Sequence, residues 1–123
     1  MILKSLLDNE FDIAAVFTQP DKKVGRKQEV VCSPVKDLAQ KNKIEIFQPQ
    51  SLRESGLSGE IEKIKPDLFV VAAYGKILPK EFLEIPKHGV VNVHGSLLPK
   101  YRGASPVQCA ILAGEKETGI TLM

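Results

Sequence analysis

Residues 89–108 read GVVNVHGSLLPKYRGASPVQ, and this stretch decides the fold that the sequence predicts. Its β-branched run, Val90 to Val93, predicts a strand. Glycine, serine and proline follow at once, so we expect the strand to end near His94 and the chain to turn there. Side chains alternate along a strand, which places Asn92 and His94 on one face at its carboxyl end. Ligands of open parallel α/β sheets bind at that end.

An amide beside an imidazole suits acyl-group chemistry. The Asn92 amide can donate a hydrogen bond to a developing oxyanion. Imidazole groups titrate near neutral pH, so His94 can move a proton. A histidine at a strand end is more often a structural residue whose hydrogen bonds are satisfied. The residues of this stretch alone leave both interpretations open.

Predicted strands and helices alternate outward from this stretch. We expect further strands at 11–18, 44–47, 67–73 and 118–123, and helices at 1–7, 33–43, 51–65, 79–83 and 105–114. The strands at 11–18 and 67–73 are typical of parallel strands buried on both faces. Ser33-Pro34 and Ser105-Pro106 each combine a capping residue with a first-turn proline. This alternation predicts an α/β fold with a mainly parallel sheet and right-handed crossovers.

The composition is that of one globular domain. The chain has 123 residues, of which 43% are hydrophobic and 26% charged, and a chain of this length buries roughly two-thirds of its unfolded surface. A net charge of +2 is too small to indicate nucleic-acid binding by itself. No apolar run approaches the ~20 residues of a membrane helix. Cys32 and Cys109 lack metal-ligand spacing, so we expect a cytoplasmic protein with reduced thiols and no metal.

Two junctions that follow predicted strands are further candidates for a site. Tyr74 and Gly75 can form a pocket wall, although a plain turn with Ile77 and Leu78 in the core explains them equally well. Residues 19–31 are expected to form a loop, which can grip a phosphate backbone through Lys22, Lys23, Arg26 and Lys27. A solvated surface loop would carry the same residues. His88 precedes the strand at 90–93 and is interpreted as structural or solvent-exposed.

Several motifs, in this order and at this spacing, resemble the folate-dependent formyltransferases. The central motif is Asn92-Val-His94 followed by Ser96-Leu-Leu-Pro99. Four flanking motifs are similar to the branch of that family that formylates initiator methionyl-tRNA: TQPD (18–21) with Gly25-Arg26, SPVK (33–36), AYGKILP (73–79) and RGASP (102–106). The resemblance covers essentially the whole chain.

The resemblance implies a Rossmann-like catalytic domain with helices on both faces of an open sheet. The implied reaction of translation initiation passes a formyl group from 10-formyltetrahydrofolate to the α-amine of methionine on initiator tRNA. Asn92 would donate to the oxygen of the tetrahedral intermediate, and His94 would assist proton transfer. The folate pocket would be bordered by Ser96, Leu97, Leu98, Pro99, Tyr74 and Gly75. The acceptor stem region of the tRNA would be contacted by Lys22, Lys23, Arg26 and Lys27.

The sequence departs from the family pattern at both ends. The family begins with a strand before the helix at 1–7, its catalytic aspartate lies beyond Met123, and its C-terminal tRNA-binding domain has no counterpart here. We therefore expect residues 1–123 to be a partial catalytic domain without turnover of its own, and the full-length protein to be a monomer. We expect loose packing, because without the first strand of the family the two strands beside it would have backbone edges without hydrogen-bond partners.

Two other functions stay open at this point. Residues 92–103 would also fit a sugar-nucleotide formyltransferase, although the loop that begins at Gln19 argues against it. The other alternative is a non-catalytic folate-binding remnant.

Overall fold

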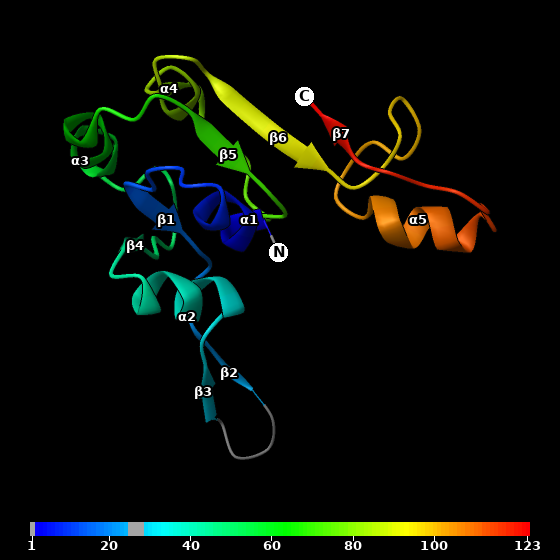
Figure 1. Cartoon of the computed structure of the whole chain (residues 1–123), viewed down its shortest axis with the longest axis horizontal. Coiled ribbons are helices and arrows are strands. Elements are labelled where there is room, and N and C mark those ends of the chain that lie inside the picture. The colour runs from blue at the N-terminus through cyan, green and yellow to red at the C-terminus, as the bar shows by residue number, and fades with distance from the viewer. Residues whose placement is uncertain (1, 25–28) are drawn as a thin grey trace. The chain divides into compact units, whose positions relative to one another are not determined.

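The computed structural model describes residues 2–24 and 29–123, and the chain divides into two compact units, Met1–Pro66 and Asp67–Met123. The elements of the first unit are α1 (Ile2–Asp8), β1 (Ala15–Phe17), β2 (Lys22–Val24), β3 (Glu29–Val31), α2 (Pro34–Lys41), β4 (Glu45–Phe47) and α3 (Leu57–Ile64). Those of the second are β5 (Phe69–Val71), α4 (Lys80–Leu83), β6 (Val90–His94), α5 (Pro106–Leu112) and β7 (Thr121–Leu122), as Figure 1 shows.

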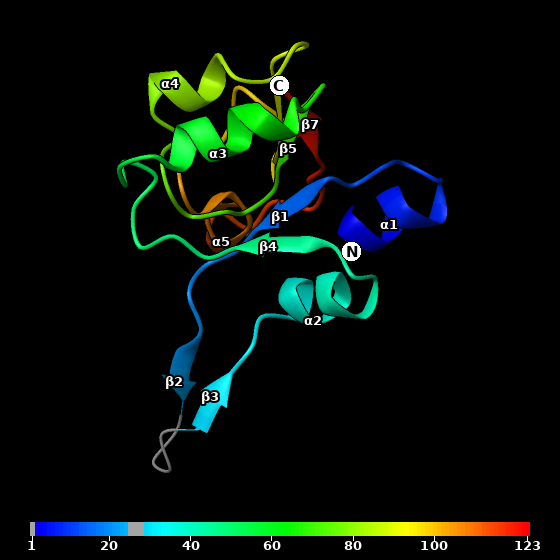
Figure 2. The same ribbon diagram turned by 90° about the vertical axis from the view of Figure 1, so that its left-hand side faces the viewer.

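The first unit is built on a parallel pair of strands, β1 and β4, which lie side by side in Figure 2. Val16 pairs with Ile46 and is buried. Phe17 and Phe47 also pair, and their rings stack with centroids 4.9 Å apart. Stacked aromatic rings on paired strands stabilise both the pairing and its register. The parallel arrangement confirms the strands predicted at 11–18 and 44–47.

Helix α2 crosses between β3 and β4, and its start was predicted correctly. The backbone N–H of Lys36 donates to Oγ of Ser33 at 3.1 Å, and Pro34 occupies the first turn. This bond satisfies one of the free N–H groups of the helix start. Ala39 is fully buried on the inner face. The helix ends at Lys41, two residues earlier than expected.

Helix α3 covers only the second half of the predicted segment 51–65. It begins after Gly56, whose φ of +85° lies in the left-handed region that favours glycine. Leu57 and Ile61 are four residues apart and both are buried, as expected for one face of a helix. The helix stops at Ile64, just before Pro66.

The prediction of a loop at 19–31 was wrong for residues 22–24 and 29–31, which form two antiparallel strands. Lys22 pairs with Val31, and Val24 pairs with Glu29. β-branched residues in each strand favour extended backbone, and the charged residues among them concealed that pattern. The hairpin extends away from β1 and β4 in both Figure 1 and Figure 2. Gly25 lies outside the described residues.

The second unit is a three-stranded sheet in the order β5-β6-β7. β5 and β6 are parallel, with Val71 opposite Asn92, and α4 connects them. β7 is antiparallel to β6, with Thr121 opposite His94. Phe82 of α4 and Ala110 of α5 are buried. Strand, helix and strand therefore alternate as predicted.

Three details differ from the sequence-based expectations. The strands predicted at 11–18 and 67–73 are three residues long, and neither is buried throughout, since Phe11 is 61% exposed and Val70 is 40% exposed. Ser105 precedes α5 as predicted, but its side chain makes no capping hydrogen bond, because its backbone is not extended as a cap requires.

Candidate active site

Strand β6 presents Asn92 and His94 on one face, as predicted. The strand ends at His94, and both side chains are half-buried. Two residues along a strand span about 6.6 Å, so both groups can reach one small reacting group. The backbone of Asn92 exchanges hydrogen bonds with Met123, at 2.7 and 3.1 Å. Within the described part of the chain, no hydrogen bond occupies the Asn92 side-chain amide.

The hydrogen bond of His94 identifies which ring nitrogen carries a proton. Nε2 lies 3.1 Å from the backbone oxygen of Tyr101. A carbonyl oxygen only accepts hydrogen bonds, so Nε2 must be the donor. In the neutral ring the lone pair is then on Nδ1, which has no hydrogen-bond partner among the described residues. Nδ1 is therefore the nitrogen of His94 that can accept a proton.

The turn that follows His94 is fixed by hydrogen bonds to β7 and within itself. Ser96 is fully buried, and its Oγ donates to the backbone oxygen of Lys100 at 2.8 Å. Oγ1 of Thr121 donates to the backbone oxygen of Ser96 at 2.7 Å and accepts from the N–H of Leu98 at 3.1 Å. The Leu98–Pro99 peptide is cis. Thr121 thus attaches the turn to the strand that pairs with β6.

The predicted folate-pocket residues in this turn have different surroundings. The Ser96 hydroxyl donates its proton within the turn, and the placement of Ser96 at the border of a folate pocket stays a prediction. Leu98 is half-buried. Leu97 is 54% exposed, and with the exposed Pro99 and with Tyr101 it lines a cavity of about 290 Å³. Ligand pockets are typically about 300–1,000 Å³, so this cavity lies just below that range, and its role as a folate pocket stays a prediction.

Tyr74 and Gly75 follow β5 and lie at the same edge of the sheet as His94, because β5 and β6 are parallel. Tyr74 is half-buried, and Gly75 has a φ of +78°, which favours glycine. Ile77 is 94% exposed, so the alternative that placed it in the core was wrong. A role of Tyr74 and Gly75 in a pocket wall stays a prediction.

A second polar cluster lies at the base of the β2–β3 hairpin. Nζ of Lys36 is 2.5 Å from Oδ2 of Asp21, with side chains only 14% and 24% exposed. Nε2 of Gln48 donates to Oδ1 of Asp21 and to the backbone oxygen of Gln19, both at 2.9 Å. The hydrogen bond from Lys36 holds the pKa of Asp21 below its ordinary value, and the same bond raises the pKa of Lys36. The cluster joins the start of the hairpin to α2 and to the end of β4.

The four basic residues predicted to contact tRNA belong to this hairpin. Lys22 begins β2 and is exposed, and Lys23 follows it in the strand. Arg26 and Lys27 lie outside the described residues. Their contact with tRNA stays a prediction.

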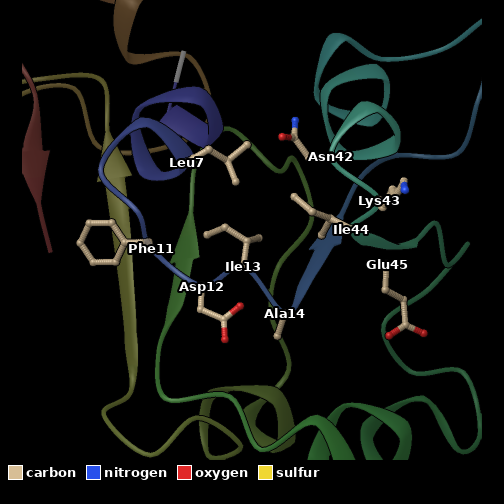
Figure 3. Close-up of a pocket in the computed structure, with 9 residues that line it drawn as sticks. All are labelled: Leu7, Phe11, Asp12, Ile13, Ala14, Asn42, Lys43, Ile44 and Glu45. Atoms are coloured by element: carbon tan, nitrogen blue, oxygen red, sulfur yellow. The ribbon is translucent and has the colours of Figure 1, made fainter.

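A larger cavity, of about 440 Å³, lies in the first unit, beside the amino ends of β1 and β4. In Figure 3 the side chains of Leu7, Ile13 and Ile44 point into a common space. The segments at 12–14 and 44–45 that line it stand at the amino ends of β1 and β4. Ligands of such sheets bind at the carboxyl ends, so this cavity is not a candidate active site.

Neither a metal site nor a membrane span emerges from residues 2–24 and 29–123. No group of three or more His, Cys, Asp or Glu side chains in these ranges is arranged to hold a metal ion. No helix in these ranges has the length and apolar character needed to cross a membrane.

Sequence reasoning missed residues that hold the turn after His94, in the second unit, and the Asp21 cluster, in the first. Thr121, Glu115 and Gln48 each bond to a residue more than a dozen positions away. No local pattern marks such partners. For Thr121, the position opposite His94 in an antiparallel strand would have been a usable signal, had the pairing of β6 with β7 been predicted.

Comparison with known proteins gives consistent results at the levels of family, sequence and fold. The family model described as "Formyl transferase" matches residues 1–123. A protein of Alkaliphilus oremlandii named "Methionyl-tRNA formyltransferase" is 56% identical over 121 residues, which cover 98% of this chain and 39% of that protein. Proteins of the same name from Acetivibrio thermocellus and Pseudomonas fluorescens are 54% and 51% identical, with the same 98% coverage of this chain. The matches thus span 38–39% of the length of these relatives.

Solved structures show the fold. Glycinamide ribonucleotide transformylase 1 of Geobacillus kaustophilus has a TM-score of 0.74 at 22% identity, and the match covers 96% of this chain and 63% of that one. Phosphoribosylglycinamide formyltransferase of Anaplasma phagocytophilum has a TM-score of 0.72 at 25% identity, covering 98% and 55%. The Rossmann-like α/β fold predicted from the sequence is confirmed.

Proposed function

Because this chain belongs to the formyl transferase family, we propose that the carboxyl end of β6 transfers a formyl group from 10-formyltetrahydrofolate to the α-amine of methionine on initiator tRNA. The observation that carries the proposal is the pairing of Asn92 and His94 on one face of β6, with the proton of His94 on Nε2. That arrangement offers one hydrogen-bond donor and one proton acceptor to the same reacting group.

Asn92 acts on the formyl oxygen. When the amine attacks the formyl carbon, negative charge develops on that oxygen, and the Asn92 amide N–H donates to it. A donor that is already in place costs no reorganisation at the moment of reaction. The backbone hydrogen bonds between Asn92 and Met123 hold this donor in position.

His94 acts on the proton of the attacking amine. The amine must lose a proton as its bond to the formyl carbon forms, and the nitrogen that leaves must gain one. Nδ1 of His94 is the acceptor for the first proton, because Nε2 is already bonded to the Tyr101 carbonyl. The protonated ring can then return the proton from Nδ1 to the leaving nitrogen.

The folate co-substrate, when bound, supplies a formyl group on a nitrogen that can leave. The turn after His94 fits a flat ring, because Leu97 and Pro99 offer it an exposed apolar surface beside the half-buried site. Gly119 packs against Leu97 so closely that an added Cβ would lie 2.7 Å from Leu97 Cδ2. That close approach limits where the Leu97 side chain can lie.

The hairpin β2–β3 is the tRNA-binding element in this proposal. Its lysine and arginine side chains would neutralise tRNA phosphates. The ion pair between Asp21 and Lys36, with the hydrogen bond from Gln48, fixes the segment just before β2. We place the reaction in the cytoplasm, where initiator tRNA is charged, and we expect a monomer.

The experiment replaces the matched segment of the Alkaliphilus oremlandii relative with residues 1–123. This chimera should formylate methionyl-tRNA and leave a nucleotide-linked amino sugar unmodified. Transfer to the sugar alone would support the sugar-nucleotide alternative. Folate binding without transfer to either acceptor would support the folate-binding remnant.

The role of the hairpin is tested in the same chimera. Serine at positions 22, 23, 26 and 27 should raise KM for methionyl-tRNA and flatten its dependence on salt, because fewer counterions are released. KM for the folate should not change. The matched control places serine at four exposed lysines outside the hairpin, Lys41, Lys63, Lys87 and Lys116. Equal effects of the two sets on KM for tRNA would refute a specific role of the hairpin.

A further inference from the structure

Tyr101 has an unusual backbone conformation at the point where it meets His94. Its φ is +57°, in the left-handed region that bulky residues rarely adopt. This conformation accompanies the contact between the Tyr101 carbonyl and Nε2 of His94, at 3.1 Å. Residues in such conformations persist only where their surroundings hold them. The contacts of Tyr101 therefore show what keeps its carbonyl on the imidazole.

Glu115 holds Tyr101 from beyond the end of α5. The Tyr101 hydroxyl donates to Oε1 of Glu115 at 2.6 Å, and Nζ of Lys100 lies 2.8 Å from the same oxygen. The Glu115 side chain is only 28% exposed. One carboxylate thus binds the side chains of two neighbouring residues in the turn. Ser96 holds the same turn from the other side, through the backbone oxygen of Lys100.

At neutral pH the Glu115 carboxyl group is ionised and the Tyr101 hydroxyl is protonated, so the hydrogen bond between them is maintained. The hydrogen bond from Lys100 holds the pKa of Glu115 below its ordinary value of 4.5, so the group is a carboxylate at neutral pH. The hydrogen bond to Glu115 raises the pKa of Tyr101 above 10.0, so the hydroxyl keeps its proton and donates. Neither group titrates in the range where an imidazole does.

We propose that Tyr101 and Glu115 are positioning residues that fix the tautomer of His94. Glu115 holds the Tyr101 side chain, the Tyr101 carbonyl stays on Nε2 of His94, and Nδ1 is thereby kept as the proton acceptor. The functional meaning of this tautomer rests on the proposed function of His94. The positioning itself is a property of this chain that can be measured without turnover.

The test uses the chimera of the proposed-function experiment, with ¹⁵N-labelled histidine. Residues 1–123 contribute two histidines, His88 and His94, and replacing each in turn by glutamine assigns its pair of ring-nitrogen signals. His88 is exposed and reports the tautomer mixture of a free imidazole in the same spectrum. At a pH where both rings are neutral, His94 should be entirely in the Nε2–H form. A wild-type His94 that shows the mixture of His88 would overturn the proposal.

Two variants separate positioning from general stability. Tyr101→Phe removes only the hydroxyl, and Glu115→Gln removes the charge that holds it. Both should move the His94 nitrogen shifts toward those of His88. The matched control is Glu117→Gln, an exposed carboxylate two residues further along, which should leave the His94 signals unchanged. If Glu115→Gln unfolds the chain, the milder Tyr101→Phe decides, and unchanged His94 signals in it would refute the proposal.

The test also distinguishes this inference from the proposed function. A tautomer that shifts in both variants, in a protein that transfers no formyl group, would leave the positioning intact and remove the function. Where transfer occurs, the same variants in the chimera should lower kcat about tenfold, a part of the usual contribution of a general base, and should change KM for folate by less, although Tyr101 and Glu115 also line the cavity beside Leu97. The pH profile of kcat should change as well, because the proton-accepting nitrogen is no longer fixed. A loss confined to KM would contradict positioning of His94.

Discussion

Thr121→Val should loosen the turn that follows His94. The substitution keeps the shape of the side chain and removes its hydroxyl, which donates to the Ser96 backbone oxygen at 2.7 Å and accepts from the Leu98 N–H at 3.1 Å. A hydrogen bond contributes about 0.5–1.5 kcal/mol net, and a buried group left unpaired costs about 1–3 kcal/mol. We therefore expect a loss of about 2 kcal/mol for the two bonds together.

Amide hydrogen exchange at Leu98 measures this loss where it occurs. A change of 1.4 kcal/mol corresponds to a factor of ten, so the Leu98 amide should exchange roughly 30-fold faster in Thr121→Val. The exchange rates of the β5 amides, which Thr121 does not contact, should change far less.

Two controls accompany this measurement. Thr121→Ser retains the hydroxyl and should keep the Leu98 amide protected. Thr118→Val changes an exposed threonine three residues earlier and should have no effect. Wild-type protection of Leu98 in Thr121→Val would refute the reasoning that this hydroxyl fixes the turn.

Further predictions concern the stability of the first unit, with one control residue, Ile77, in the second. Ile61→Ala should lower the free energy of unfolding by about 2–5 kcal/mol, because Ile61 is only 2% exposed. Ile77→Ala should change that free energy little, because Ile77 is 94% exposed. Urea titration of both variants measures the two changes. The ion pair of Asp21 should contribute stability above pH 3.8, the ordinary pKa of the group, and that contribution should disappear as the pH falls through the lower pKa of the folded state. Asp21→Asn should lack this part of the acid transition in melts recorded against pH. The pKa of Lys36 is raised above 10.5, so its contribution should be complete below that pH and lost at higher pH.

Elements with local signals were predicted well. Helix α2 was found because Ser33 and Pro34 mark its start, and β6 because a run of valines ends in glycine. The placement of Asn92 and His94 followed from alternation along β6 alone. These features depend on neighbours in sequence, so one sequence is enough to predict them.

Features that depend on distant pairing were missed. The hairpin requires Lys22 to pair with Val31, and nothing in either short strand specifies the partner. The contact of Glu115 with Tyr101 crosses 14 residues and an entire helix. Such contacts arise from how elements pack, which periodicity does not encode. The sequence therefore predicted where Asn92 and His94 lie on β6, but not the long-range contacts of the turn that follows them.

The most direct test of the function assigned to β6 compares the two histidines in the chimera. His94→Ala should lower kcat for formyl transfer to methionyl-tRNA by about 10²–10⁴, the usual contribution of a general base. His88→Ala, which removes an exposed imidazole before the same strand, should leave kcat unchanged. A His94→Ala chimera with the kcat of the unsubstituted protein would contradict the assignment of proton transfer to this site.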